Sequence, residues 1–280
     1  MKGSGRTSAS RQRWRCTACG ASAARRIDSS AKALAAFLAR LLSKDAAAEL
    51  PAGRSTFWRR TSWAWRIWPA APPTDEVHGV VFLDGIWMRR RAVVLIAVAG
   101  GRVIGWHLAR SERAEPWPAL MSRIPAPATA VSDGARGLAK AAGIAWPSTR
   151  IQRRTFHAAS QVRRRRTTLN PRLAAGIANK LSEARDADAA ASWLAEYSEW
   201  CTRWDGFLRE FTLKDGKRQY AHEPLRKARR GLNKLVKEGA LFTFVEMAAE
   251  RGDEWPATNN AVESVNARLR EMLRLHRGLP

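Results

Sequence analysis

Three apolar segments of strand length follow one another between residues 77 and 110, and this run constrains the fold more than any other part of the sequence. The segments are VHGVVFLDG (77–85), AVVLIAVAG (92–100) and RVIGWHLAR (102–110). Gly100 and Gly101 separate the last two, and a pair of glycines between apolar runs is typical of a β-hairpin. The run is therefore expected to form neighbouring strands of one sheet.

The residues that follow alternate between helix and strand periodicity. Helices are predicted over 115–124 and 134–143, and strands over 128–133 and 149–156. Strands that alternate with helical crossovers form a mixed sheet covered by helices. The fold class predicted for residues 75–170 is therefore α/β.

Helical regions lie on both sides of this α/β segment. Residues 30–70 contain two predicted helices joined by a short Pro-Gly turn, which suits a helix-turn-helix DNA reader or a plain helical hairpin. Residues 171–254 show helical patterns with a turn at KDGK (214–217) and are predicted to be an all-α insertion, and residues 255–280 contain a closing helix. Residues 1–29 are small, polar and basic, and are expected to form an arm or loop.

The chain is strongly basic, with 49 Lys and Arg against 25 Asp and Glu and a net charge of +24. Such a charge predicts a polyanionic partner, because Lys and Arg release counterions from a phosphate backbone. Residues 134–182 contain no acid, whereas in 183–211 acidic side chains outnumber basic ones. Charge that is zoned in this way favours nucleic acid as the partner. The candidate DNA-binding residues are Arg59, Arg60, Arg66, Arg163, Arg164, Arg165 and Arg166. For the run 163–166 a solvated helix face is the alternative.

Membrane and disulfide signals are weak in this sequence. No stretch reaches the roughly 18 apolar residues of a membrane span, and the N-terminus lacks the apolar run of a signal peptide, so we expect a cytoplasmic protein with no membrane partner. The spacing of Cys16 and Cys19 matches half of a zinc ribbon, which needs four ligands. Zinc is therefore not expected in this chain, and Cys201 is predicted to lie in a helix core.

Two aspartates stand where strands are predicted to end. Asp84 follows VVFL and Asp133 follows TAVS, and each is followed at once by glycine. Strand ends form the crevice where ligands bind in open α/β sheets, and glycine lets a substrate backbone approach. The alternative is that Asp-Gly merely makes a turn after each strand.

A third carboxylate, Glu263, lies in the segment ATNNAVESVNARLR (257–270), beside the apolar stripe of a predicted helix. Asn260 and Asn266 accompany it, and they could orient Glu263, contact DNA or cap the helix. Three converging carboxylates repel one another unless a cation joins them, and oxygen ligands of this type favour Mg²⁺ or Mn²⁺. Two such ions about 4 Å apart stabilise the in-line displacement at a phosphodiester.

In their order and spacing these motifs carry a resemblance. The set FLDG, VSDG and ATNNAVESVNARLR, with an all-α insertion before the glutamate, resembles a DDE transposase of bacterial insertion sequences, in the Mutator-like group. Further matching stretches are RWRCTACG, DEVHGVVFLDGIW, AVVLIA, GWHLARSE, FHAASQVRR and MLRLHRGL, and together they span nearly the whole chain. The resemblance implies an RNase H-like catalytic core over 75–170 and 255–280, with Asp84, Asp133 and Glu263 as ligands of Mg²⁺ or Mn²⁺.

The same resemblance implies the activity. Such an enzyme cleaves phosphodiester bonds at the element ends and joins the freed 3′-hydroxyl to target DNA, as a homo-oligomer on DNA in the bacterial nucleoid. The alternatives are a non-catalytic DNA-binding remnant of a transposase and an RNase H-like nuclease without transposition.

The sequence departs from its relatives at several places. They carry Cys or Asp three residues before the histidine that corresponds to His157, where this chain has Arg154. His157 is a candidate accessory residue that supports the site or contacts DNA, with a structural histidine as the alternative. The relatives also have an earlier cysteine pair and a further aromatic-rich helix, so we expect a chain shortened at both ends.

Overall fold

The computed structural model describes residues 1–8, 10–24, 29–43, 54–88, 91–164, 171–252, 255 and 260–275. The chain divides into two compact units, Met1–Pro69 with Leu269–Pro280, and Ala70–Arg268. Within the described ranges, no helix is both long and apolar enough to span a bilayer.

The first unit begins with a small antiparallel sheet where the sequence predicts an arm or loop. Its strands are β1 (Lys2–Arg6), β2 (Gln12–Arg15) and β3 (Ser22–Ala24), in that order. Nearly all of their side chains are exposed, so no apolar alternation marks them in the sequence. The turns between the strands define this sheet instead. In the turn between β2 and β3, Cys16 N–H donates to Ala21 O at 2.8 Å, and Gly20 adopts a φ of +74°.

The helices predicted in 30–70 are present. They are α1 (Ser30–Leu42), α2 (Arg54–Thr61) and the 3₁₀ helix η2 (Ser62–Arg66). Phe37 of α1 is buried and meets Trp65 of η2 edge-to-face, with ring centroids 4.8 Å apart. The aromatic residues therefore include packing contacts between these helices, while the polar side of α2 stays exposed.

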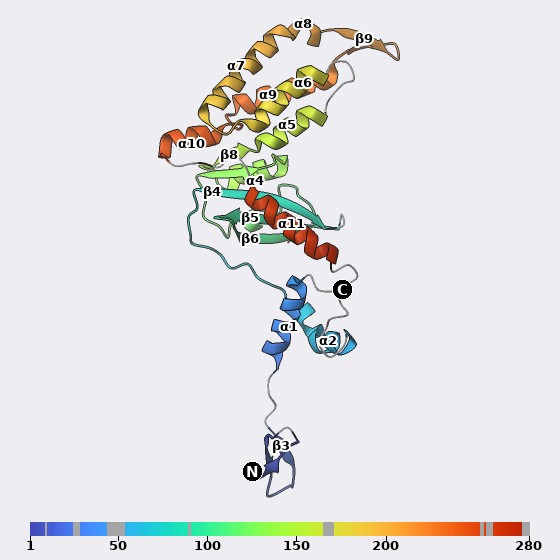
Figure 1. Cartoon of the computed structure of the whole chain (residues 1–280), viewed down its shortest axis with the longest axis vertical. Helices are drawn as coiled ribbons and strands as arrows, with labels where there is room; N and C mark the ends of the chain where they lie inside the picture. Colours follow the sequence, from blue (N-terminus) through green and yellow to red (C-terminus); the bar gives the residue numbers. More distant parts are fainter. Residues whose placement is uncertain are drawn as a thin grey trace. The chain divides into compact units, whose positions relative to one another are not determined.

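A five-stranded mixed sheet is the centre of the second unit (Figure 1). The strands are β4 (Val80–Met88), β5 (Ala92–Ala99), β6 (Arg102–Ala109), β7 (Thr129–Ser132) and β8 (Arg150–Arg153), in the order β6-β5-β4-β7-β8. β5 pairs antiparallel with both β4 and β6, whereas β4, β7 and β8 are parallel. The prediction of a mixed α/β fold is confirmed.

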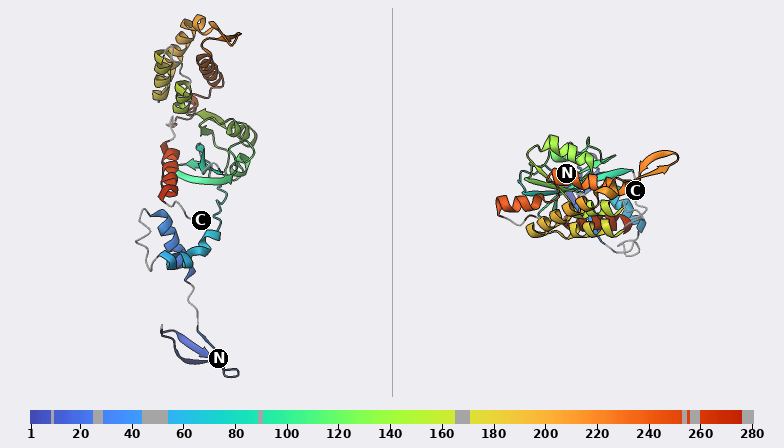
Figure 2. Two further views of the ribbon diagram at one scale, coloured as in Figure 1. Left: turned by 90° about the vertical axis from the view of Figure 1, so that its right-hand side faces the viewer. Right: turned by 90° about the horizontal axis from the view of Figure 1, so that it is seen from above.

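Helices cover the two faces of this sheet. α3 (Trp117–Met121) and α4 (Arg136–Ala145) pack on one face against alternate residues of β4, among them Val81 and Leu83. The helix α11 (Asn260–Leu275) lies on the opposite face (Figure 2). Side chains alternate along a strand, so Asp84 points to the α11 side.

The helical block has a core of its own. It consists of α5 (Thr155–Arg164), α6 (Pro171–Glu183), α7 (Ala187–Arg203), α8 (Asp205–Leu208), α9 (Glu223–Lys237) and α10 (Thr243–Arg251). Ala158, Ala159 and Val162 of α5 belong to this core, together with Trp193 and Leu232. The block thus begins near residue 155 rather than 171, because the predicted strand over 149–156 stops at Arg153 and the chain turns directly into α5.

A β-hairpin interrupts the region predicted to be all-α. β9 (Phe211–Lys214) and β10 (Lys217–Tyr220) pair antiparallel around Asp215 and Gly216. Both turn residues have positive φ, 50° and 70°, which is the geometry of a two-residue hairpin turn. Phe211 and Tyr220 stack across the strands with ring centroids 4.4 Å apart, so the prediction of a turn here was right but that of an all-α insertion was wrong.

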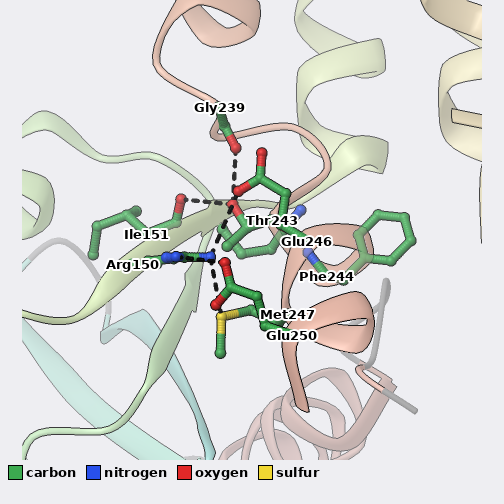
Figure 3. Close-up of polar contacts among 9 residues, drawn as sticks. Arg150, Ile151, Gly239, Thr243, Phe244, Glu246, Met247 and Glu250 are labelled. Atoms are coloured by element: carbon green, nitrogen blue, oxygen red, sulfur yellow. Dashed lines mark hydrogen bonds and ion pairs between the residues drawn. The ribbon is translucent and has the colours of Figure 1, made fainter. Parts of the chain in front are cut away.

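The segment after α9 is fixed to the edge strand β8. Gln152 is 1% exposed, donates through Nε2 to Leu241 O at 2.8 Å and accepts from Phe244 N–H at 3.0 Å. At the surface, Arg150 reaches Glu250 at 2.8 Å, and the buried Thr243 hydroxyl donates to Gly239 O at 2.9 Å (Figure 3). Because buried amide groups without partners are costly, these bonds hold the helical block in a defined place on the sheet.

Candidate active site at the strand ends

Asp84 lies inside β4, not at its end as the sequence suggests. β4 continues to Met88 as the antiparallel partner of β5, and Asp84 pairs with Ile96. The parallel partner β7 stops earlier, at Ser132. From Asp84 onward, β4 therefore extends past the end of β7. The Asp-Gly turn that was the alternative here is absent, because the strand continues.

Strand register places three charged residues in one row. The pair Phe82↔Val131, continued by two residues, brings Asp84 level with Asp133. The pair Ser132↔Arg153, continued by one residue, brings Asp133 level with Arg154. Two carboxylates and one guanidinium from three neighbouring strands thus gather at the same edge of the sheet, as expected for strand ends that form a crevice.

The carboxylate of Asp84 is held by three groups. Asn266 Nδ2 donates to its Oδ2 at 2.6 Å, Arg154 Nη2 lies 3.4 Å from the same oxygen, and Gly85 N–H donates to Oδ1 at 3.0 Å. The Asp84 side chain is only 15% exposed and that of Arg154 only 6%. Because both groups are withdrawn from water, their attraction is screened far less than in a surface ion pair.

Helix α11 reaches this carboxylate from 182 positions away along the chain. Asn266 is 2% exposed and Val262, one turn earlier, is fully buried. Glu263 lies three positions before Asn266 on the same helix and is exposed. Residues three apart are neighbours on a helix surface, so Glu263 lies next to Asn266 on α11. Asn260 is the first residue of α11, and its side chain is outside the described part.

Asp133 makes the turn that leads into α4. Its Oδ1 accepts from Ala135 N–H at 2.9 Å, and Gly134 has φ +82°. The turn interpretation of Asp-Gly therefore holds at this position. A Cβ on Gly134 would overlap the guanidinium of Arg153, so the glycine also leaves room for that side chain.

Glu112 is a third carboxylate at this edge that the sequence reasoning missed. A Cβ on Gly85 would lie 2.5 Å from its Oε1, and Trp87 Nε1–H donates to its Oε2 at 3.2 Å. Burial raises the pKa of Glu112, and the charges of Asp133 and Asp84 raise it further. Its position three residues after β6 was a usable signal, because β6 is parallel to β4 and their carboxyl ends share one edge.

His157 lies on the far side of Arg154 from Asp84. Its Nε2 is 3.4 Å from Arg154 Nη1. Burial lowers the pKa of His157, and the charge of Arg154 lowers it further, while Asp133 and Asp84 act in the opposite direction. The imidazole is therefore held in its neutral form next to the row of charges.

The candidate DNA-binding arginines are separated along the chain. Arg59 and Arg60 of α2 and Arg66 of η2 are exposed. Arg163, near the end of α5, is half-buried, with its guanidinium carbon 5.7 Å from the ring centre of Phe156. For Arg164 only the backbone is described, and Arg165 and Arg166 lie outside the described residues.

Carboxylates of this kind are the ligands that Mg²⁺ and Mn²⁺ prefer, but the side chains as they lie do not fit such an ion. Among the residues that the structure describes, no three His, Cys, Asp or Glu side chains come together closely enough to hold a metal. The Asp84 oxygen that faces Asn266 is also engaged by the cationic Arg154. An ion at Asp84 would have to displace that guanidinium.

The cysteine pair forms a tight turn at the end of β2. Hydrogen bonds from the backbone amides of Cys19 and Ala18 lower the pKa of the Cys16 thiol. A thiolate is the form that binds metal, but a zinc site needs four ligands and this turn supplies two. The expectation of no zinc stays a prediction.

Comparison of the sequence with known proteins identifies no family for this chain. No protein-family model matches the sequence, and no curated protein matches it.

Replacing Glu112 by glutamine is expected to raise the melting temperature at pH 7 by about 2 °C. The folded chain holds the Glu112 proton above the ordinary pKa of 4.5, so stability falls as the pH rises through the window between 4.5 and the raised value. Glutamine removes this penalty and can still accept from Trp87. Thermal melts at pH 7 and pH 4 test this, with the exposed Glu115→Gln as the control. A lower melting temperature at pH 7 would contradict the sign.

Proposed function

We propose that the chain is a DDE transposase of an insertion sequence, which cleaves phosphodiester bonds at element ends and joins 3′-hydroxyl ends to target DNA. The observation that carries the proposal is the hydrogen bond from Asn266 to Asp84, because it brings the helix of Glu263 onto the strand of the first aspartate. The helical block between these residues has its own core, as an inserted domain would.

The sheet supports the same proposal. Five strands in the order β6-β5-β4-β7-β8, with only the second strand antiparallel to its neighbours, are the arrangement expected of an RNase H-like core. In this proposal Asp84 and Asp133 on adjacent strands and Glu263 on α11 are the catalytic carboxylates. Fold likeness alone does not establish an activity, so the proposal depends mainly on the hydrogen bond that brings α11, the helix of Glu263, to Asp84.

The proposed partners follow from charge. A net charge of +24 and the exposed Arg59, Arg60 and Arg66 fit DNA as the ligand. The resemblance, not the charge, implies a homo-oligomer on DNA in the bacterial nucleoid. The resemblance also implies Mg²⁺ or Mn²⁺, which Asp84, Asp133 and Glu263 would hold once Arg154 is withdrawn from Asp84. Among the chain's own residues, Arg154 and Asn266 hold the Asp84 carboxylate in place.

One observation favours a second candidate, a non-catalytic DNA-binding remnant of a transposase. Arg154 stands where the resemblance expects Cys or Asp, and it forms a buried ion pair with Asp84. A carboxylate neutralised by a tethered cation is a poorer metal ligand than a free one. The two candidates share the fold and DNA binding and differ in strand cleavage.

Nicking of supercoiled plasmid DNA that contains the coding sequence with its natural flanks tests the proposal. The wild-type chain with Mn²⁺ is expected to nick this plasmid but not one without the flanks. Asp133→Asn should reduce nicking at least about 100-fold, and asparagine can still accept from Ala135 N–H, so the fold is kept. Binding without nicking by the wild type would favour the remnant, and equal nicking by Asp133→Asn would remove Asp133 from the chemistry.

A further inference from the structure

A cleft of about 640 Å³ lies within the second unit, between the ends of β7 and β8 and the helices α5 and α9. Ser132 and Gly134, the two neighbours of Asp133, both line it. In Figure 1, α5 and α9 lie next to each other beyond the end of β8. The cleft therefore lies on the α4 side of the sheet, beside the backbone of Asp133, and extends into the helical block.

The lining of the cleft is strongly cationic. Arg136 of α4, Arg153 of β8, and Lys227 and Lys234 of α9 contribute positive charge, and Glu238 is the one acid among its lining residues in the described part of the chain. Three separate elements, α4, β8 and α9, thus contribute cations to the lining of one cleft. A narrow recess lined by one sign of charge concentrates ligands of the opposite sign.

Arg153 is the feature that points to a bound anion. It is 6% exposed, and its Nε–H has no hydrogen-bond partner among the described residues. Burial lowers the pKa of Arg153, with the charge of Asp133 acting in the opposite direction, so the guanidinium is desolvated without full compensation. A phosphate oxygen in the cleft would supply the missing acceptor.

The wall formed by α9 has a fixed position. Arg153 N–H donates to Ala240 O at 2.7 Å, directly after the turn that ends α9. Gln152 Nε2 also donates to Leu241 O, just after this turn. In Figure 3 the Thr243 hydroxyl donates to Gly239 O within the turn, and Arg150 of β8 pairs with Glu250 of α10. The backbone of this wall is therefore in place before any ligand arrives, and the entropy cost of binding is limited to ordering its side chains.

We propose that this cleft binds the sugar–phosphate backbone of a short single-stranded DNA segment next to Asp133, with Arg153, Lys227 and Lys234 as its phosphate contacts. The choice of DNA rests on the proposed function. The volume of the cleft is within the range of sites for small ligands, roughly 300–1,000 Å³, and is too small for a DNA duplex. Apolar residues such as Val162 and Leu235 also line it, and they suit sugar and base faces.

The matched pairs of cations on α9 provide the test. All four residues, Lys227, Arg230, Lys234 and Lys237, are exposed on this helix, and of these only Lys227 and Lys234 line the cleft. One double variant combines Lys227→Ala with Lys234→Ala, and the other combines Arg230→Ala with Lys237→Ala. Both remove the same charge from α9, and alanine preserves helix propensity. Thermal melts establish that both double variants fold.

Fluorescence anisotropy of the full chain with a labelled 12-nucleotide single strand is the measurement. The cleft pair is expected to weaken binding at least about tenfold and to lower the slope of log K against log salt by about 1.4, since each lost phosphate contact on a single strand contributes about 0.7. The control pair should change affinity less than about threefold. Equal effects of the two pairs would overturn the proposal.

The plasmid assay separates this inference from the proposed function. Nicking by the wild type together with equal effects of the two pairs would refute the cleft and leave the transposase proposal standing. Selective loss of single-strand binding in a chain that never nicks would support the cleft and refute the catalytic proposal.

Discussion

Replacing Arg154 by methionine is expected to tighten Mn²⁺ binding at least about tenfold, equivalent to ~1.4 kcal/mol. The guanidinium lies 3.4 Å from Asp84 Oδ2, and both side chains are nearly buried, so an incoming ion must compete with a tethered cation for the same oxygen. Methionine keeps much of the packing volume and removes the competitor. Isothermal titration of Mn²⁺ into the wild type and the variant measures the difference.

Arg150→Met is the matched control for this experiment. Arg150 begins the same edge strand and forms exposed ion pairs with Glu246 and Glu250, far from the row of Asp84 and Asp133 along β8. Its replacement should leave Mn²⁺ affinity unchanged. Without metal, Arg154→Met should also melt earlier than the wild type, because Asp84 loses its charge partner, and Mn²⁺ should restore part of that loss. Mn²⁺ affinity equal to or below that of the wild type would contradict competition.

Replacing Glu263 by glutamine is expected to reduce plasmid nicking at least about 100-fold while leaving the melting temperature unchanged within about 1 °C. Glu263 is exposed on α11, and its charge is not needed to hold the helix, which is anchored by the buried Val262 and Asn266. A loss of activity with no loss of stability would identify a catalytic role rather than a structural one.

Two other glutamates decide how this result is interpreted. Glu271 lies two turns further along α11, and Glu271→Gln should retain full nicking activity. Glu112 is the rival for the third carboxylate, since its charge interacts with both Asp133 and Asp84. Unchanged nicking by Glu263→Gln, with loss in Glu112→Gln, would replace Glu263 by Glu112 in the account.

Much of the sheet could be predicted from the sequence. The apolar runs at 77–110 and the glycine pair at 100–101 predict β4, β5 and β6, and ATAVSD predicts β7. These strands carry their signal locally, because buried strands need continuous apolar residues. The closing helix was equally visible, since Val262, Val265, Leu269 and Leu273 lie three or four residues apart.

The environment of the carboxylates could not be predicted in the same way. Asp84 and Asp133 were identified, but the extent of β4 beyond Asp84 depends on pairing with β5, which no local pattern reveals. Glu112 meets Gly85 only through the order of the strands. The hairpin around Asp215 and Gly216 was missed because two strands of four exposed residues leave no periodic signal.

Anomalous diffraction from crystals of the chain grown with Mn²⁺ and element-end DNA tests the central claim most directly. We expect a Mn²⁺ peak held by Asp84 and Asp133, with Glu263 turned towards it and Arg154 withdrawn from Asp84. Mn²⁺ bound only elsewhere, with Arg154 still paired to Asp84 and Glu263 directed into solvent, would contradict it.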